Sequence, residues 1–128
     1  MIYRIEKDDF RLDLELNKWC DDNGEINADL TIRVKCEGFY GSTTVDFVAE
    51  DFLIFLEELQ ELKDTLTGKA ELKEPYSWDP FLIFEGDGRG HIHISASITS
   101  QNSDWLQELN FENEIDQTFL PMQQVYDL

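Results

Sequence analysis

The sequence predicts one α+β domain over residues 1–128, built mainly from an antiparallel sheet of about six to seven strands. A central helix is expected to cover one face of this sheet, and a short helix to end the chain. Apolar and polar residues alternate through most of the chain, whereas one central segment repeats its apolar residues every three or four positions. Every strand with a clear pattern keeps one polar face, as antiparallel sheets with one solvated side do.

The first two strands are predicted at residues 10–17 and 26–36. Apolar residues occupy every second position in both segments, which is the period of a half-buried strand. The sequence Asp22-Asn23-Gly24 between them favours a three-residue turn, in which Gly24 supplies the positive φ. The two segments should therefore form a hairpin.

This hairpin fixes the expected positions of the two cysteines. Its register places Cys20 opposite Ile26, and Cys36 several residue pairs away, opposite Phe10. Such a separation exceeds the Cα distance of about 7 Å that a disulfide can span. Cys36 is therefore expected to be a buried thiol in a reducing compartment.

A third strand is predicted around Gly41 to Val48, and a helix follows from Glu50 to Leu66. Glu50 and Asp51 would lie in the first helical turn, where the helix dipole favours anions. Gly68 is the expected C-terminal stop. The apolar positions recur at helical spacing and comprise Phe52, Phe55, Leu56, Leu59, Leu62 and Leu66.

Strand patterns return after the helix, at residues 70–73, 80–85, 91–99 and about 105–115. Leu109 and Phe111 of the last segment should point inward. The chain is then expected to end in a short helix that is capped at Thr118 or later, because Pro121 has no N–H and fits only the first turn. Its buried side would carry Phe119, Met122 and Tyr126.

The charge of the chain is strongly negative. It contains 28 acidic and 10 basic residues, with no Lys or Arg after Arg89, for a formal charge of −18. Such a surface repels nucleic acid and anionic lipid, so we expect no partner of either kind, and it favours a basic protein partner or none. No signal peptide is expected, because residues 1–7 lack its basic-then-apolar layout. No membrane span is expected either, because the longest apolar run is only Phe52 to Leu56. These features predict a cytoplasmic protein, and nothing in the pattern selects an oligomeric state.

The predicted helix carries an acidic ridge. Four carboxylates fall within roughly 60° of one another, opposite the apolar stripe, and Ile54 projects from the middle of them. Such a ridge could be a docking surface for a basic protein, with charge speeding the encounter and Ile54 as an anchor. An ordinary solvated helix face is the competing interpretation. The predicted partner-binding residues are Glu50, Ile54, Glu57, Glu61 and Asp64.

His91 and His93 form a second candidate site. Two residues apart on a strand, both side chains should point to the same face, about 7 Å apart. Two imidazoles so placed can chelate zinc, copper or nickel, with further ligands from nearby acids such as Glu85 or Asp87. Polar positions on an open sheet face are the simpler interpretation.

Signals for catalysis are weak. The chain has no P-loop, dinucleotide-binding or zinc-protease motif, and 28 carboxylates nominate no particular catalytic pair. The segments 21–25 and 87–90 are rich in Asp and Gly, but they have the composition of tight turns rather than the ligand spacing of an EF-hand. We therefore expect no enzyme and no cofactor.

The C-terminal part of the chain resembles a family of small bacterial proteins. The resemblance rests on the strand and turn from Leu109 to Pro121, with its Asp116-Gln117-Thr118, on the helix that leads into Gly68, and on the segment around His91 and His93. Such proteins are similar to immunity proteins encoded beside wall-associated and other polymorphic bacterial toxins. The resemblance covers about the last two thirds of the chain and implies a toxin partner. It nominates no residue that contacts the toxin.

Three hypotheses follow. The leading one is a small acidic binding module, an immunity protein that neutralises a basic toxin domain such as a nuclease. The second is a structural or regulatory protein whose acidity serves solubility and which has no dedicated partner. The third is a metal-binding protein that uses His91 and His93.

Overall fold

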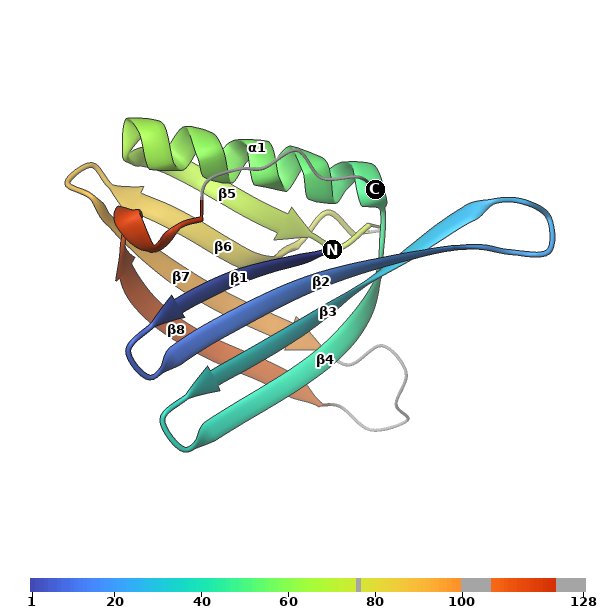
Figure 1. Cartoon of the computed structure of the whole chain (residues 1–128), viewed down its shortest axis with the longest axis horizontal. Coiled ribbons are helices and arrows are strands. Elements are labelled where there is room, and N and C mark those ends of the chain that lie inside the picture. The colour runs from blue at the N-terminus through green and yellow to red at the C-terminus, as the bar shows by residue number, and fades with distance from the viewer. Residues whose placement is uncertain (76, 100–106, 122–128) are drawn as a thin grey trace.

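A computed structural model describes residues 1–75, 77–99 and 107–121, which form two four-stranded antiparallel sheets and one α-helix (Figure 1). The first sheet consists, in spatial order, of β1 (Ile2–Lys7), β2 (Phe10–Cys20), β3 (Ile26–Cys36) and β4 (Phe39–Phe47). The second consists of β5 (Thr67–Lys73), β6 (Pro80–Asp87), β7 (His91–Thr99) and β8 (Glu108–Asp116). Helix α1 (Ala49–Thr65) connects the two sheets. The α+β class and the antiparallel pairing are confirmed, but the described residues form eight strands in two sheets instead of six or seven in one.

The two sheets lie face to face and bury each other's apolar side. At one side of the molecule β4 contacts β8, and at the other α1 runs along β5 and also touches β2 and β6 (Figure 1). The helix therefore fills the open side between the sheets. The face that was predicted to be covered by the helix is covered mainly by the other sheet. This arrangement leaves the outer face of each sheet and one face of α1 in solvent.

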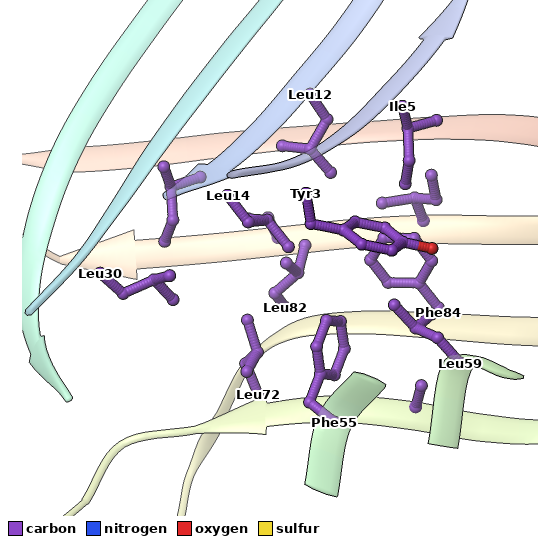
Figure 2. Close-up of a cluster of buried hydrophobic side chains, with 14 of the residues drawn as sticks. Tyr3, Ile5, Leu12, Leu14, Leu30, Phe55, Leu59, Leu72, Leu82 and Phe84 are labelled. Atoms are coloured by element: carbon purple, nitrogen blue, oxygen red, sulfur yellow. The ribbon is translucent and has the colours of Figure 1, made fainter. Parts of the chain in front are cut away.

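The core draws side chains from all three layers (Figure 2). Tyr3 and Leu14 come from the first sheet, Phe84 comes from the second, and Phe55 and Leu59 come from the helix, all of them buried. The rings of Phe55 and Phe84 meet edge to face with centroids 5.7 Å apart. An aromatic pair of this geometry contributes about 0.5–1.5 kcal/mol beyond its buried area, so it fixes α1 against the second sheet.

The predicted hairpin register is confirmed. In the β2–β3 pair, Cys20 lies opposite Ile26 and Cys36 opposite Phe10. Both cysteines are free, and Cys36 is half-buried rather than fully buried. Gly24 has the expected positive φ of 80° in the turn.

The helix begins and ends within a residue or two of the prediction, but Gly68 does not end it. Leu66 follows the last helical residue with a left-handed φ of 66°, and its N–H donates to the Leu62 carbonyl. A non-glycine residue holds this conformation because the N–H of Gly88 donates to the Leu66 carbonyl at 2.9 Å. Gly68, with φ 98°, lies within β5 instead.

The end of the described chain is shorter than predicted. A 3-10 turn, η1 (Gln117–Phe119), follows β8 and is capped by Asp116, whose carboxylate accepts from the Thr118 N–H at 2.9 Å. This turn closes before Pro121, so the proline does not need to fit a first helical turn. Phe119 is exposed rather than buried. The predicted positions of Met122 and Tyr126, and the predicted start of the last strand at residue 105, lie outside the described residues.

Two features of the fold were not predicted. Strand β1 pairs with β2 and buries Tyr3 and Ile5. The β2–β3 hairpin extends beyond the body of the molecule as an arm (Figure 1). No helix in the described part of the chain has the length and apolar content needed to cross a membrane.

Candidate binding surface

The outer face of α1 carries the acidic ridge. The ridge is defined by Glu50, Ile54, Glu57, Glu61 and Asp64, and the structure leaves all five exposed. Ile54 is 53% exposed although it lies on the same helix as five fully buried apolar residues. The residues predicted for docking therefore occupy one accessible face. Their role in binding remains a prediction.

Contacts on the opposite side of α1 fix the orientation of the ridge. Phe52 and Phe55 are buried in the core. On one flank, the Glu58 carboxylate accepts from the backbone N–H of Glu71 in β5, which is the edge strand of its sheet. Elsewhere on α1, Lys63 donates to the carbonyl of Leu120 at 2.7 Å. These ties prevent the helix from rotating, so the ridge is a fixed feature of the surface.

The ridge carboxylates keep their charge available. None of the ion pairs among the described residues includes Glu50, Glu57, Glu61 or Asp64. Asp64 accepts a hydrogen bond from the Gln60 side chain at 3.2 Å, which does not neutralise it. Glu61 and Asp64 also lie near the C-terminal end of α1, where the helix dipole disfavours negative charge.

Beside the N-terminal half of α1 lies a groove of about 160 Å³, which we call the Trp78 groove. Its apolar lining comes from Trp78, Ile54 and Phe47. Trp78 is 70% exposed and has a positive φ of 63°, an uncommon backbone conformation for a bulky residue. The loop is held by backbone bonds in which the N–H of Trp78 donates to Glu74 and the N–H of Glu74 donates to Asp79.

A second groove, of about 380 Å³, lies between the hairpin arm and the start of α1. We call it the arm groove. Trp19 and Ile26 from the arm line it together with Val48, and Phe47 lines both grooves. Trp19, Ile26 and Val48 are exposed large apolar residues, as are Ile54 and Trp78 beside the first groove. Such a concentration of exposed apolar side chains beside charged ones is typical of protein interaction sites.

The outer face of the first sheet has a different character, because several of its charged side chains form ion pairs. Asp13, only 5% exposed, receives hydrogen bonds from Arg4 at 2.7 Å and from Arg11 at 3.2 Å. Arg33 contacts Glu15 at 3.2 Å across the neighbouring strand pair. The Arg4–Asp13 and Arg33–Glu15 pairs each join neighbouring strands, so charge attraction adds to the backbone pairing on this face. We call these five side chains the paired face.

The two arginines control the ionisation of Asp13. Burial of its carboxyl group opposes ionisation and alone would raise the pKa. Hydrogen bonds and charge attraction from Arg4 and then Arg11 outweigh the burial, so the pKa of Asp13 lies below its usual value. Asp13 is thus ionised at neutral pH and ties β1 to β2.

The two histidines lie on the exposed face of β7, and each contacts a different acid. The Nδ1 atom of His91 lies 3.1 Å from Asp87, whereas the Nε2 atom of His93 lies 3.4 Å from Glu112. Potential ligand atoms of Asp87, His91 and Glu114 lie within 4.8 Å of one another. His91 thus lies near the carboxylates of Asp87 and Glu114, whereas His93 pairs separately with Glu112.

The two Asp-rich segments act as turns, as predicted. One carboxylate oxygen of Asp21 accepts from the N–H groups of Asn23 and Glu25, both at 2.9 Å. One carboxylate oxygen of Asp87 likewise accepts from the N–H groups of Arg89 and His91. In both cases the backbone hydrogen bonds stabilise the anion, and they lower the pKa of each carboxyl group despite the opposing effect of burial.

Sequence reasoning found the ridge but not the grooves beside it. Trp19 falls at a position where the alternation of β2 predicts a polar residue. Trp78 lies in a loop between Pro75 and Pro80. Neither tryptophan therefore belongs to the apolar face of a predicted strand. The available signal was a tryptophan at a polar position of a strand pattern, as for Trp19, or between two prolines outside any pattern, as for Trp78. The structure shows that both lie near the start of α1.

The fold and the surface together define a small antiparallel α+β protein whose most distinctive features are an unpaired acidic helix face and exposed tryptophans, as in a protein-binding module. The chain matches the Immunity protein WapI-like family over residues 3–123, and it belongs to that family. The match includes the N-terminal strands, which the sequence resemblance did not reach. Membership implies a cognate toxin as partner. No curated protein and no solved structure matches the chain significantly.

Proposed function

We propose that this protein neutralises a basic toxin domain by docking its acidic ridge against the toxin's cationic surface. Family membership supplies the toxin as partner. The observation that carries the charge argument is that four ridge carboxylates are exposed on one fixed helix face and form no ion pair with any residue that the structure describes.

The mechanism is electrostatic competition. A nuclease holds the phosphates of its substrate in a cleft lined by Lys and Arg, and an acidic surface of matching extent can occupy the same cleft. Unpaired carboxylates also steer a cationic partner during diffusion and can raise the association rate by roughly 10 to 1,000-fold at low salt. Ile54, in the middle of the ridge, would supply apolar contact once the surfaces meet.

The ridge can be tested by charge reversal of Glu57 and Glu61 to Lys in one variant. Binding to the toxin encoded beside the gene would be followed by stopped-flow mixing at several salt concentrations. We expect the association rate to fall at least about tenfold at low salt and its salt dependence to flatten, because these charges steer the encounter.

A matched control reverses Glu108 and Glu112, two exposed acids on β8, which lies at the opposite side of the second sheet from α1. This variant has the same net charge as the ridge variant, so it separates a local surface from the overall field. If both variants lose the same fraction of the association rate, the ridge acts only through the net charge of the protein. An unchanged rate in the ridge variant would reject ridge docking altogether.

A metal site is a second candidate, favoured by the convergence of Asp87, His91 and Glu114. A nitrogen and two carboxylates suit zinc, with solvent completing the coordination. Calorimetric titration with zinc should then show binding at micromolar protein that His91→Ala abolishes and His93→Ala reduces less. Absence of heat in the wild-type protein would dismiss this function.

A further inference from the structure

We infer that the Trp78 groove receives a single Lys or Arg side chain from the toxin, which makes it the specificity pocket of the interface. The inference rests on the proposed function, since it assumes a basic protein as partner. It goes further in naming the position on the surface, the residues and the chemical group that is recognised.

The apolar walls of the groove suit the stem of a long cationic side chain. Trp78 and Ile54 are both largely exposed, and together with Phe47 they line a space of about 160 Å³. Lys and Arg bury their methylene chains along apolar surfaces while the charged group stays near polar atoms. Tryptophan is also the best aromatic partner for a cation, and a guanidinium group can stack on its ring.

The carboxylates that line the groove suit the charged end of that side chain. Asp51, Glu58, Glu71 and Glu74 contribute four acids, against the single amine of Lys73. Glu58 accepts a hydrogen bond from the backbone N–H of Glu71, and Glu74 accepts one from the Ser77 hydroxyl, so the partner of each is a neutral group rather than a cation. Unlike a general acidic patch, this groove combines carboxylates with an exposed tryptophan in one concave space. That combination selects a cation with an apolar stem over an anion or a purely apolar group.

The position of the groove divides the ridge into two parts. Ile54 belongs to both the ridge and the groove, whereas Asp64 lies about 2.8 turns further along α1. Contact should therefore centre on the N-terminal half of the helix, close to the arm groove. The C-terminal carboxylates of the ridge would then act mainly through long-range attraction.

The first test needs no toxin. The full-length ¹⁵N-labelled protein would be titrated with N-acetyl-arginine amide at millimolar concentration while the indole N–H signals of the tryptophans are followed by NMR. N-acetyl-citrulline amide serves as the probe of nearly equal shape without charge. We expect the arginine probe to shift the Trp78 signal, assigned with Trp78→Phe, and to leave the Trp19 signal nearly unchanged.

Variants locate the site. The double variant Glu58→Gln with Glu74→Gln should abolish most of the Trp78 shift, whereas Glu108→Gln with Glu112→Gln should leave it intact. An equal shift with citrulline would overturn the inference, since charge would then play no part. So would an equal shift at Trp19, or a concentration-dependent Trp78 shift without any probe, which would indicate a second copy of the chain in the groove.

A second test uses the toxin. Trp78→Ala should weaken toxin binding at least about tenfold through faster dissociation, with Phe39→Ala, at an exposed aromatic residue that lines neither groove, as the matched control. Trp78 is largely exposed, so an unchanged melting temperature is expected, and Trp78→Phe is the milder variant if the loop is disturbed. Toxin binding that resists both Trp78 variants would overturn the specificity pocket while leaving ridge docking in place. If reversing Glu57 and Glu61 leaves the association rate with the toxin unchanged while the arginine probe still shifts the Trp78 signal, the proposed function alone is rejected.

Discussion

Two charged surfaces of this protein, the paired face of the first sheet and the acidic ridge of α1, use similar residues in opposite ways. On the paired face Arg4 and Arg11 hold the nearly buried carboxylate of Asp13. On the ridge, Glu57 and Glu61 stand one helical turn apart, and within the described ranges neither forms an ion pair. Charge on the first surface holds strands together, whereas charge on the second is left for a partner.

The difference shows how a protein with a formal charge of −18 can fold and still present a strong field. Six of its ten basic residues lie in the first four strands, and three of the arginines there form the paired face. Their ion pairs stabilise the fold locally, so they neutralise little of the helix surface. The ridge instead gathers like charges, which repel one another and lower stability slightly.

The largest expected effect comes from breaking the paired face at Asp13. Asp13→Asn removes the charge that holds two arginines, at a position that is only 5% exposed. We expect the free energy of unfolding to fall by about 1–3 kcal/mol, because hydrogen bonds to a charged group are lost. Chemical denaturation at pH 7 measures this change, and Asp64→Asn on the ridge is the control that should cost nothing.

The same contrast should depend on pH. The pKa of Asp13 is lower in the folded than in the unfolded chain, so its ionised form stabilises the fold above the ordinary carboxyl value of about 4. This contribution is lost as the pH falls from there through the folded pKa. The stability gap between wild type and Asp13→Asn should therefore stay constant from pH 7 to about pH 5 and shrink as the pH falls below about 4, measured by denaturation at each pH. A constant gap would show that the two carboxyl oxygens act by shape rather than charge.

A smaller effect is expected for the half-exposed pair of Arg33 and Glu15. Arg33→Gln should lower the free energy of unfolding by about 0.5 kcal/mol, since both side chains retain contact with solvent. A double-mutant cycle with Glu15→Gln isolates the pair from other effects of each change. High salt should reduce the coupling energy between Arg33 and Glu15. A coupling energy as large as the loss expected for Asp13→Asn would contradict the distinction between buried and exposed pairs.

The smallest effect should have the opposite sign. Glu61→Lys replaces an acid near the C-terminal end of α1 and converts repulsion from Glu57 into attraction. We expect stability to rise by about 0.5 kcal/mol at low salt and the gain to vanish at high salt. Thermal melts at two ionic strengths measure it. A loss of stability instead would mean that the ridge has a structural role.

The fold was largely predictable because its period-two and helical patterns are local. The β2–β3 register followed from the alternation and the Gly24 turn, and it matched at both cysteines. Strand β1 was missed although Tyr3 and Ile5 alternate with Arg4 and Glu6, because six residues carry little pattern. The division into two sheets depends on which apolar faces meet, and the strand patterns do not determine this pairing. The left-handed Leu66 likewise depends on a contact with Gly88, 22 positions further along the chain.

The candidate site divides in the same way. Helical spacing alone placed the ridge carboxylates on one exposed face. Trp78 and Trp19 come close to that face only because the loop before β6 and the hairpin arm both lie beside the start of α1. Their proximity is a tertiary property. Spacing along the chain therefore identified the charges but missed the apolar residues that give the surface its shape.

The bond from the Glu71 N–H to Glu58 has a consequence for the kind of toxin contact that is possible. An outer strand with free amide groups invites an incoming strand, and this is a common way for proteins to recruit extended peptides. Here a side chain of α1 already occupies the rim of β5. A toxin segment therefore cannot pair with β5 at Glu71 while Glu58 holds that N–H, and selectivity at this position must come from side chains that meet side chains.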